Sequence, residues 1–264
     1  MSLKPITVYG HGPGPNPWKV IMVLEELNIP YTHKIVDFPD MKKEPFESIN
    51  PNGRVPAIED PNTDITLWES GAIVEYLVDT YDKQNTISFA IGSKEYHFAK
   101  QWLHFQVSGQ GPYFGQAIWF SRFHSEKVQS AIDRYINEIR RVSSVLNRAL
   151  EGKQYLVGDK FSYVDAAFVP WYLLTGQFGI DMEKEFPNVA AWLKLVQERP
   201  AITKTYLLNF LPFLLFPYND GRPLDRVGDS GACAIYHGLS AIDEILRVWC
   251  DGLTVACRAR KEGA

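Results

Sequence analysis

Short runs of β-branched and aromatic residues, separated by turn residues, mark the first part of the chain. They predict four strands, at residues 6–9, 31–37, 55–59 and 65–68. Asp60-Pro61-Asn62 supplies turn residues between the last two, which predicts a strand pair.

Helical spacing of apolar residues appears between these strands. Asn16-Pro17 predicts the start of a helix, with Asn16 as the N-cap, and an apolar face follows at Val20, Val23, Leu24 and Leu27. Residues 42–49 predict a short helix or turn, and residues 69–81 a further helix. The order β-α-β-α-β-β-α over residues 1–82 predicts a thioredoxin-like α/β domain.

The chain changes to a purely helical pattern after a polar linker at residues 82–92. Residues 94–121 predict a long helix bent near 109–112, and residues 125–151 an amphipathic one. Ser162 and Asp165 form a capping box before the apolar run 166–174. A helix at 188–198 is ended by Arg199-Pro200. We therefore expect an all-α domain at residues 93–205 and a C-terminal extension of unknown role at residues 206–264.

Composition narrows the class of protein. The 264 residues are 45% hydrophobic and carry a net charge of −4, without the clustered positive charge that nucleic-acid binding requires. The start predicts no signal peptide, and the longest apolar run is too short to span a membrane. The three cysteines, all in the last 32 residues, imply no disulfide framework. These features predict a cytoplasmic protein that binds neither nucleic acid nor a membrane.

The loop after the first strand argues against dinucleotide binding and excludes disulfide exchange. Gly10-His11-Gly12 begins like a dinucleotide fingerprint, but Pro15 stands where its third glycine belongs. Thioredoxin-type disulfide exchange needs C-x-x-C at the helix start, where this chain has Asn16-Pro17-Trp18-Lys19. The remaining possibility is an anion or thiolate at the helix N-terminus, with Asn16 as a donor. Alternatively, Asn16 is only a cap.

Two further segments suggest a binding site for a small peptide. Val55-Pro56 follows an Asn/Gly turn, which suggests a cis proline that leaves the Val55 backbone free to pair with an extended peptide. Glu69-Ser70 at a helix start suits an α-amino-acid head group, since the helix end binds a carboxylate and Glu69 an ammonium. An ordinary turn and an ordinary cap are the alternatives.

The order and spacing of these segments are more specific than any one of them. The pattern consists of Pro15-Asn16, then Asn50-Pro-Asn-Gly-Arg-Val-Pro56, then Trp68-Glu-Ser-Gly-Ala-Ile73. Two later segments belong to the same pattern: residues 106–116 and Phe161-Ser-Tyr-Val-Asp165. Over residues 5–205 the chain resembles the glutathione transferases, closest to the fungal subclass that includes the yeast nitrogen-regulatory prion protein. The resemblance implies glutathione as co-substrate, no metal, and a homodimer.

The resemblance also implies roles for individual residues. Glu69 and Ser70 would hold the γ-glutamyl end of glutathione, and Val55, before Pro56, would pair with its cysteinyl backbone. Lys42 or Lys43 would meet the glycine carboxylate. Tyr9 is expected to point into the core or along the sheet, which leaves Asn16 as the group that stabilises the thiolate.

The acceptor substrate is expected on the first helices of the second domain. The residues predicted to line its pocket are aromatic or carry an amide: Phe105, Gln106, Gln110, Tyr113 and Phe114. The leading interpretation is conjugation of the thiol to an apolar electrophile, in detoxification or secondary metabolism. Glutathione-dependent cis/trans isomerisation by reversible thiol addition is an alternative, and a non-catalytic binding or regulatory protein is another.

Overall fold

A computed structural model of the chain describes residues 2–11 and 14–209. They fall within a compact unit, residues 1–215. Most of the expected C-terminal extension, residues 210–264, lies outside the described residues, and so do the three cysteines.

The N-terminal part is a thioredoxin-like domain built on a mixed four-stranded sheet. Its strands are β1 (Ile6–Gly10), β2 (Tyr31–Ile35), β3 (Ala57–Asp60) and β4 (Ile65–Trp68). The spatial order is β2-β1-β3-β4, with β1 parallel to β2 and antiparallel to β3. Val8 lies opposite Ile58, and both are fully buried at the centre of the sheet.

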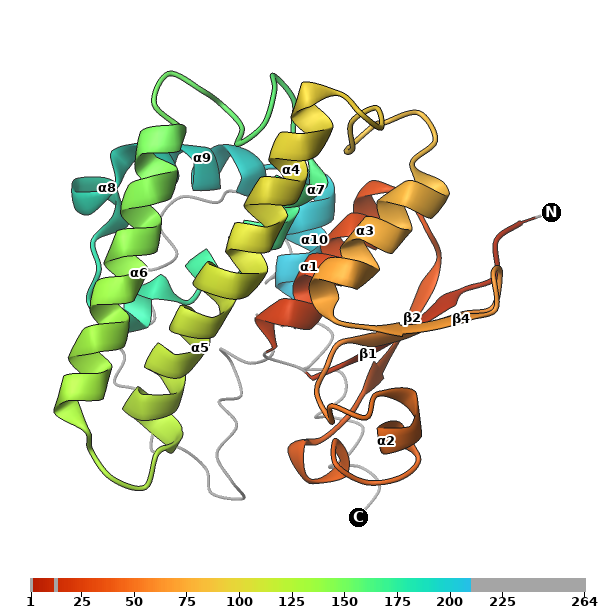
Figure 1. Cartoon of the computed structure of the whole chain (residues 1–264), viewed down its shortest axis with the longest axis horizontal. Helices are drawn as coiled ribbons and strands as arrows, with labels where there is room; N and C mark the ends of the chain where they lie inside the picture. The colour runs from red at the N-terminus through yellow and green to blue at the C-terminus, as the bar shows by residue number, and fades with distance from the viewer. Residues whose placement is uncertain (1, 12–13, 210–264) are drawn as a thin grey trace, which may run out of the picture. The chain divides into compact units, whose positions relative to one another are not determined.

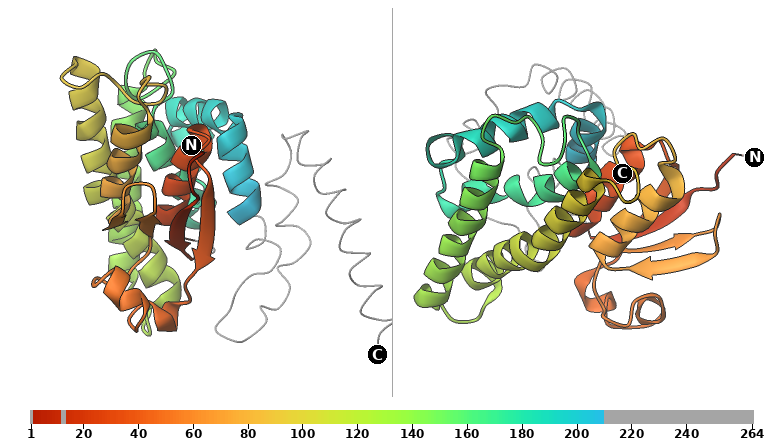
Figure 2. Two further views of the ribbon diagram at one scale, coloured as in Figure 1. Left: turned by 90° about the vertical axis from the view of Figure 1, so that its right-hand side faces the viewer. Right: turned by 45° about the horizontal axis from the view of Figure 1, so that its top comes forward.

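Two long helices cover the sheet on the side of the second domain. They are α1 (Pro15–Glu26) and α3 (Ser70–Tyr81); the connection from β2 to β3 carries the short η1 (Phe38–Asp40) and α2 (Phe46–Ile49). Figures 1 and 2 show α1 and α3 between the sheet and the helical domain. Residues 17–24 of α1 are all buried because α1 packs against α3 in its own domain and α7 and α10 in the other.

The second domain is all-helical, as the pattern predicts. Its elements are α4 (Lys94–Phe105), η2 (Gln106–Gln110), α5 (Gly111–Ile118), η3 (Trp119–Phe123), α6 (Gln129–Ala149), α7 (Tyr163–Tyr172), η4 (Thr175–Phe178), α8 (Met182–Glu185), α9 (Pro187–Gln197) and α10 (Pro200–Asn209). Every residue of α7 is buried, which makes it the central helix of the domain.

A π-helical turn, η2, lies beside residues 109–112, where the sequence predicts a bend. The segments α4, η2, α5 and η3 follow one another without interruption, and η3 is a second π-helical turn. A π turn holds an additional residue, so the side chains that follow it point in different directions from those of a regular helix. This change of register decides which residues of α5 face the cavity described below.

Candidate functional site

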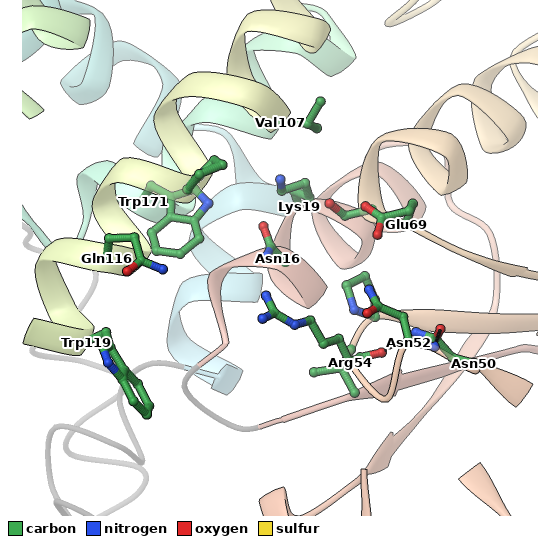
Figure 3. A pocket seen from close by; sticks show the side chains of 16 residues that line it. Asn16, Lys19, Asn50, Asn52, Arg54, Glu69, Val107, Gln116, Trp119 and Trp171 are labelled. Carbon is green, nitrogen blue, oxygen red and sulfur yellow. Dashed lines mark hydrogen bonds between the residues drawn. The ribbon is translucent and has the colours of Figure 1, made fainter. Parts of the chain in front are cut away.

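A cavity of about 540 Å³ opens between the thioredoxin-like domain and the start of the helical domain. Its size is typical of a small-molecule site. The side chains that line it come from α1, from the segment before β3, from the start of α3, from η2 to η3 and from α7 (Figure 3): Asn16, Lys19, Asn50, Asn52, Arg54, Val55, Pro56, Glu69, Ser70, Val107, Gly111, Pro112, Gly115, Gln116, Trp119 and Trp171.

Asn16 lies in the first turn of α1 and lines the cavity. The prediction that it is the N-cap is wrong: the helix begins at Pro15, and Gly14 occupies the cap position without a side-chain bond. Asn16 is half-buried, and its amide makes no hydrogen bond to another described residue. It is therefore free to serve a ligand, near the positive end of the helix dipole.

The segment before β3 is held by its own side chains. Asn50, 2% exposed, donates from Nδ2 to the Arg54 carbonyl at 2.5 Å and accepts from the Asn52 backbone at 2.9 Å. The Val55–Pro56 bond is cis, as expected. Val55 precedes the first paired residue of β3, and its N–H and C=O make no backbone hydrogen bond within the described residues. An extended backbone can pair there as an added strand.

Glu69 and Ser70 stand at the start of α3, as predicted. Glu69 adopts φ 71°, which is uncommon for a residue with a side chain. Such a conformation costs of order 1–3 kcal/mol and occurs preferentially at functional sites. Glu69 is exposed to the cavity while Ser70 is buried, so a carboxylate and a helix N-terminus adjoin each other there.

Lys19 is a cavity residue that sequence reasoning missed. It is 1% exposed, and its Nζ donates to Oε1 of Gln106 at 2.6 Å. Burial lowers the pKa of Lys19 to about 7, and the nearby charge of Glu69 opposes that shift. A signal for its burial is present in the sequence. In the helix predicted from Asn16-Pro17, Lys19 falls on the same face as the apolar residues Val23 and Leu27.

The expectation that Gln106 and Gln110 face the cavity is not met. Both are fully buried, and they form a chain in which Gln106 Nε2 donates to Gln110 Oε1 at 3.0 Å and Gln110 Nε2 to the Phe168 carbonyl at 3.0 Å. Their amides are thus satisfied within the protein, together with Lys19.

The three aromatic residues predicted for the acceptor pocket also lie elsewhere. Phe114 is fully buried against Trp171 and Tyr172. Phe105 packs on Trp102 and Phe168, and Tyr113 on Tyr135. Other residues of the same segment line the cavity instead: Val107, Gly111, Pro112, Gly115, Gln116 and Trp119.

Lys42 and Lys43 do not line the cavity. Lys43 pairs with Asp40 at 3.4 Å, with 62% of its side chain exposed. The guanidinium that lines the cavity is that of Arg54, carried by the loop that Asn50 holds. Arginine can bind a carboxylate with two parallel hydrogen bonds, so the cavity wall carries a carboxylate-binding side chain at Arg54.

Tyr9 does not line the cavity and lies along the sheet, as expected. Its hydroxyl donates to Glu59 at 2.6 Å, and its ring packs against Phe46. Burial, and then the Glu59 carboxylate, raise the pKa of Tyr9 to about 12. A phenol held in this way along the sheet is poorly placed to stabilise an anion in the cavity.

Two kinds of feature are absent from the part of the chain that the structure describes. No helix among residues 2–11 and 14–209 has the length and apolar character needed to cross a membrane. Within the same residues, no three His, Cys, Asp or Glu side chains are grouped as metal ligands.

A thioredoxin-like domain joined to an all-helical domain, with a cavity where they meet, is the architecture of the glutathione transferases. Family models of the glutathione S-transferase N-terminal and C-terminal domains match residues 13–80 and 111–200. The chain belongs to the glutathione S-transferase family, in its fungal Ure2-like subclass.

Individual relatives support this assignment. The glutathione S-transferase-like protein tpcF of Aspergillus fumigatus is 50% identical over 218 residues, 77% of this chain and 95% of that protein. The glutathione transferase URE2P6 of Phanerochaete chrysosporium, solved with oxidized glutathione, is 49% identical with a TM-score of 0.74, over 77% and 95% of the two chains. Ure2p in complex with S-p-nitrobenzylglutathione is 37% identical with a TM-score of 0.73, over 78% and 95%.

Proposed function

We propose that this protein binds glutathione in the cavity and activates its thiol for addition to an apolar electrophile. The observation that carries the proposal is the free N–H and C=O of Val55, in the same cavity as Glu69 and Ser70. The Val55 backbone can pair with a short extended peptide, and Glu69 and Ser70 can bind the ammonium and carboxylate of a free α-amino acid at the end of that peptide. Relatives bound to glutathione or to a glutathione conjugate support it.

Each polar group of the tripeptide then has a partner. The Glu69 carboxylate receives the γ-glutamyl ammonium, and Ser70 with the N-terminus of α3 receives the α-carboxylate. Val55 pairs with the cysteinyl backbone next to Pro56. Arg54, in place of Lys42 or Lys43, binds the glycine carboxylate, since it lines the cavity beside Val55.

The sulfur comes to lie beside Asn16. Its amide donates to the thiolate, and the N-terminus of α1 adds a favourable field. Lowering the pKa of a thiol by two units takes about 2.7 kcal/mol. A hydrogen bond to a charged group, of about 1.5–3 kcal/mol, and a helix dipole together are of this size.

Binding and mass measurements test the proposal. Isothermal titration calorimetry should show one glutathione per chain, and Glu69→Gln should weaken that binding more than Asp64→Asn, a change outside the cavity. Incubation with glutathione and an electrophile should then give a product heavier by the tripeptide. An unchanged product mass with a changed double-bond geometry would instead establish the isomerase function. Binding without turnover of any electrophile would establish a non-catalytic role.

A further inference from the structure

The indole of Trp171 carries a hydrogen-bond donor without a partner. Trp171 belongs to α7, is 6% exposed and lines the cavity. Its Nε1 is buried and makes no hydrogen bond among residues 2–11 and 14–209. Buried donors in folded proteins are nearly always paired, so an unpaired one at a cavity wall points to a ligand acceptor.

Two glycines of α5 lie against the indole of Trp171. A Cβ on Gly111 would lie 3.6 Å from Trp171 Nε1, and one on Gly115 would lie 3.5 Å from Trp171 Cη2. Neither contact is a clash, but larger side chains would cover the edge of the indole. In Figure 3 the Trp171 nitrogen lies on the side of the ring turned toward Asn16 and Lys19, the side on which we place the sulfur.

The side chain of Trp119, in η3 directly after α5, adds a flat apolar surface to the cavity. Trp119 lines the cavity with half of its surface exposed, and Gln116, one turn before it, adds an amide without a partner among the described residues. An aromatic face of this kind binds a planar conjugated molecule by stacking. The cavity thus combines a place for the sulfur, a buried donor and a stacking surface.

We propose that the acceptor is a planar conjugated carbonyl compound, such as an aryl enone or a quinone. Its oxygen accepts from Trp171 Nε1, and its rings stack on Trp119. The proposal deepens the proposed function and rests on it. An indole N–H donates a hydrogen bond but accepts none, which suits an oxygen that becomes negative during the reaction.

The reaction balances without an oxidant or reductant. The thiolate sulfur forms a bond to the β-carbon, the C=C pair shifts toward the carbonyl carbon, and the C=O pair moves onto oxygen. Trp171 stabilises the resulting enolate. The proton lost by the glutathione thiol to solvent is returned from solvent to the α-carbon of an enone, or to oxygen when the acceptor is a quinone. With a benzylic halide, the thiolate sulfur bonds to the benzylic carbon, the carbon–halogen bond breaks and halide leaves into solvent, so no charge develops on a carbonyl oxygen.

The contrast between these two acceptors gives the test. Trp171→Phe keeps an aromatic ring and removes the donor. It should lower kcat/KM for an aryl enone by about 10- to 100-fold and change kcat/KM for a benzylic halide by less than about threefold. Trp102→Phe, the same change in a residue that does not line the cavity, should leave both unaltered. A similar loss for both acceptors, or for neither, would overturn the proposal.

A second measurement uses the unaltered protein, so it tests the proposal even when the Trp171→Phe variant does not fold. Fluorenone should inhibit turnover of the benzylic halide at concentrations about tenfold lower than fluorene, which has the same shape without the oxygen. Equal inhibition by the two would overturn the carbonyl assignment while the proposed function stands. Absence of turnover of both the enone and the halide would overturn the proposed function, and this inference with it.

Discussion

The ammonium of Lys19 and the side-chain oxygen of Gln106 lie 2.6 Å apart, and both side chains are buried. Lys19 belongs to the glutathione-transferase N-terminal domain and Gln106 to the helical domain, so this bond joins the two domains behind the cavity. Gln110 and the Phe168 carbonyl extend it to α7. The cavity wall therefore has a polar connection in addition to the apolar core that the two domains share.

The buried amine gives stability a dependence on pH. The pKa of Lys19 falls to about 7 in the folded chain because of burial, against an ordinary value of 10.5. Between these values the unfolded chain binds more protons, so the free energy of unfolding rises with pH. Relative to Lys19→Met, the unaltered protein should gain up to about 1.4 kcal/mol per pH unit between about pH 7 and 9.5. Urea titrations at several pH values measure this difference; Lys153→Met, on an exposed side chain, should show no such slope.

Asn16 should control the ionisation of bound glutathione. Asn16→Ala removes the proposed donor to sulfur and should raise the pKa of the bound thiol by about one unit, since a hydrogen bond to a charged group contributes about 1.5 kcal/mol. Ultraviolet absorbance of the thiolate, followed against pH, measures the shift. Asn52→Ala, an amide that lines the cavity beside Arg54, should leave the thiol pKa unchanged. An equal shift in both variants would remove Asn16 from its proposed role.

Arg54 should account for the carboxylate contact. Arg54→Ala should weaken glutathione binding by about tenfold or more, the effect of losing a charge-assisted pair of about 1.5–3 kcal/mol. The double variant Lys42→Ala with Lys43→Ala should change the affinity by less than about twofold, because neither residue lines the cavity. Calorimetric titration compares the affinities of the three proteins for glutathione. A larger loss of affinity in the double variant would assign the carboxylate contact to the lysines instead of Arg54.

Asp165 should matter for stability rather than chemistry. Its buried carboxylate accepts from the Ser162 backbone and hydroxyl, from Leu156 N and from Trp192 Nε1. Asp165→Ala leaves several buried donors unpaired and should cost about 3 kcal/mol or more. Asp133→Ala, on the exposed face of α6, should cost less than about 0.5 kcal/mol. Chemical denaturation measures both; a small loss for Asp165→Ala would contradict the assigned structural role.

Local patterns in the sequence predict much of the fold and part of the site. The capping box at Ser162 and Asp165 and the turn before Val55-Pro56 are short-range features, so residues near in sequence determine them. The predicted start of α1 differs from the observed one because Pro15 and Pro17 both suit the first turn of a helix. Gly14 supplies the extended cap position without a side-chain signal.

The helix face toward the cavity could not be predicted by chemical type. The amides of Gln106 and Gln110 and the ring of Phe114 predict a cavity lining, yet these groups pack inward, where Lys19 and α7 provide partners. The cavity side carries Gly111 and Gly115, because a cavity forms where side chains are small. The partner of a buried amide lies far along the chain, so sequence alone does not reveal it.

The central claim is that glutathione lies in this cavity with its sulfur beside Asn16. A crystal structure of the protein with bound glutathione tests it most directly, through the distance from the sulfur to Asn16 Nδ2. The account predicts a distance of about 3.5 Å, a hydrogen bond to sulfur, with the cysteinyl backbone paired to Val55. A sulfur out of reach of Asn16 and in contact with Tyr9 or with a group of the helical domain would contradict it.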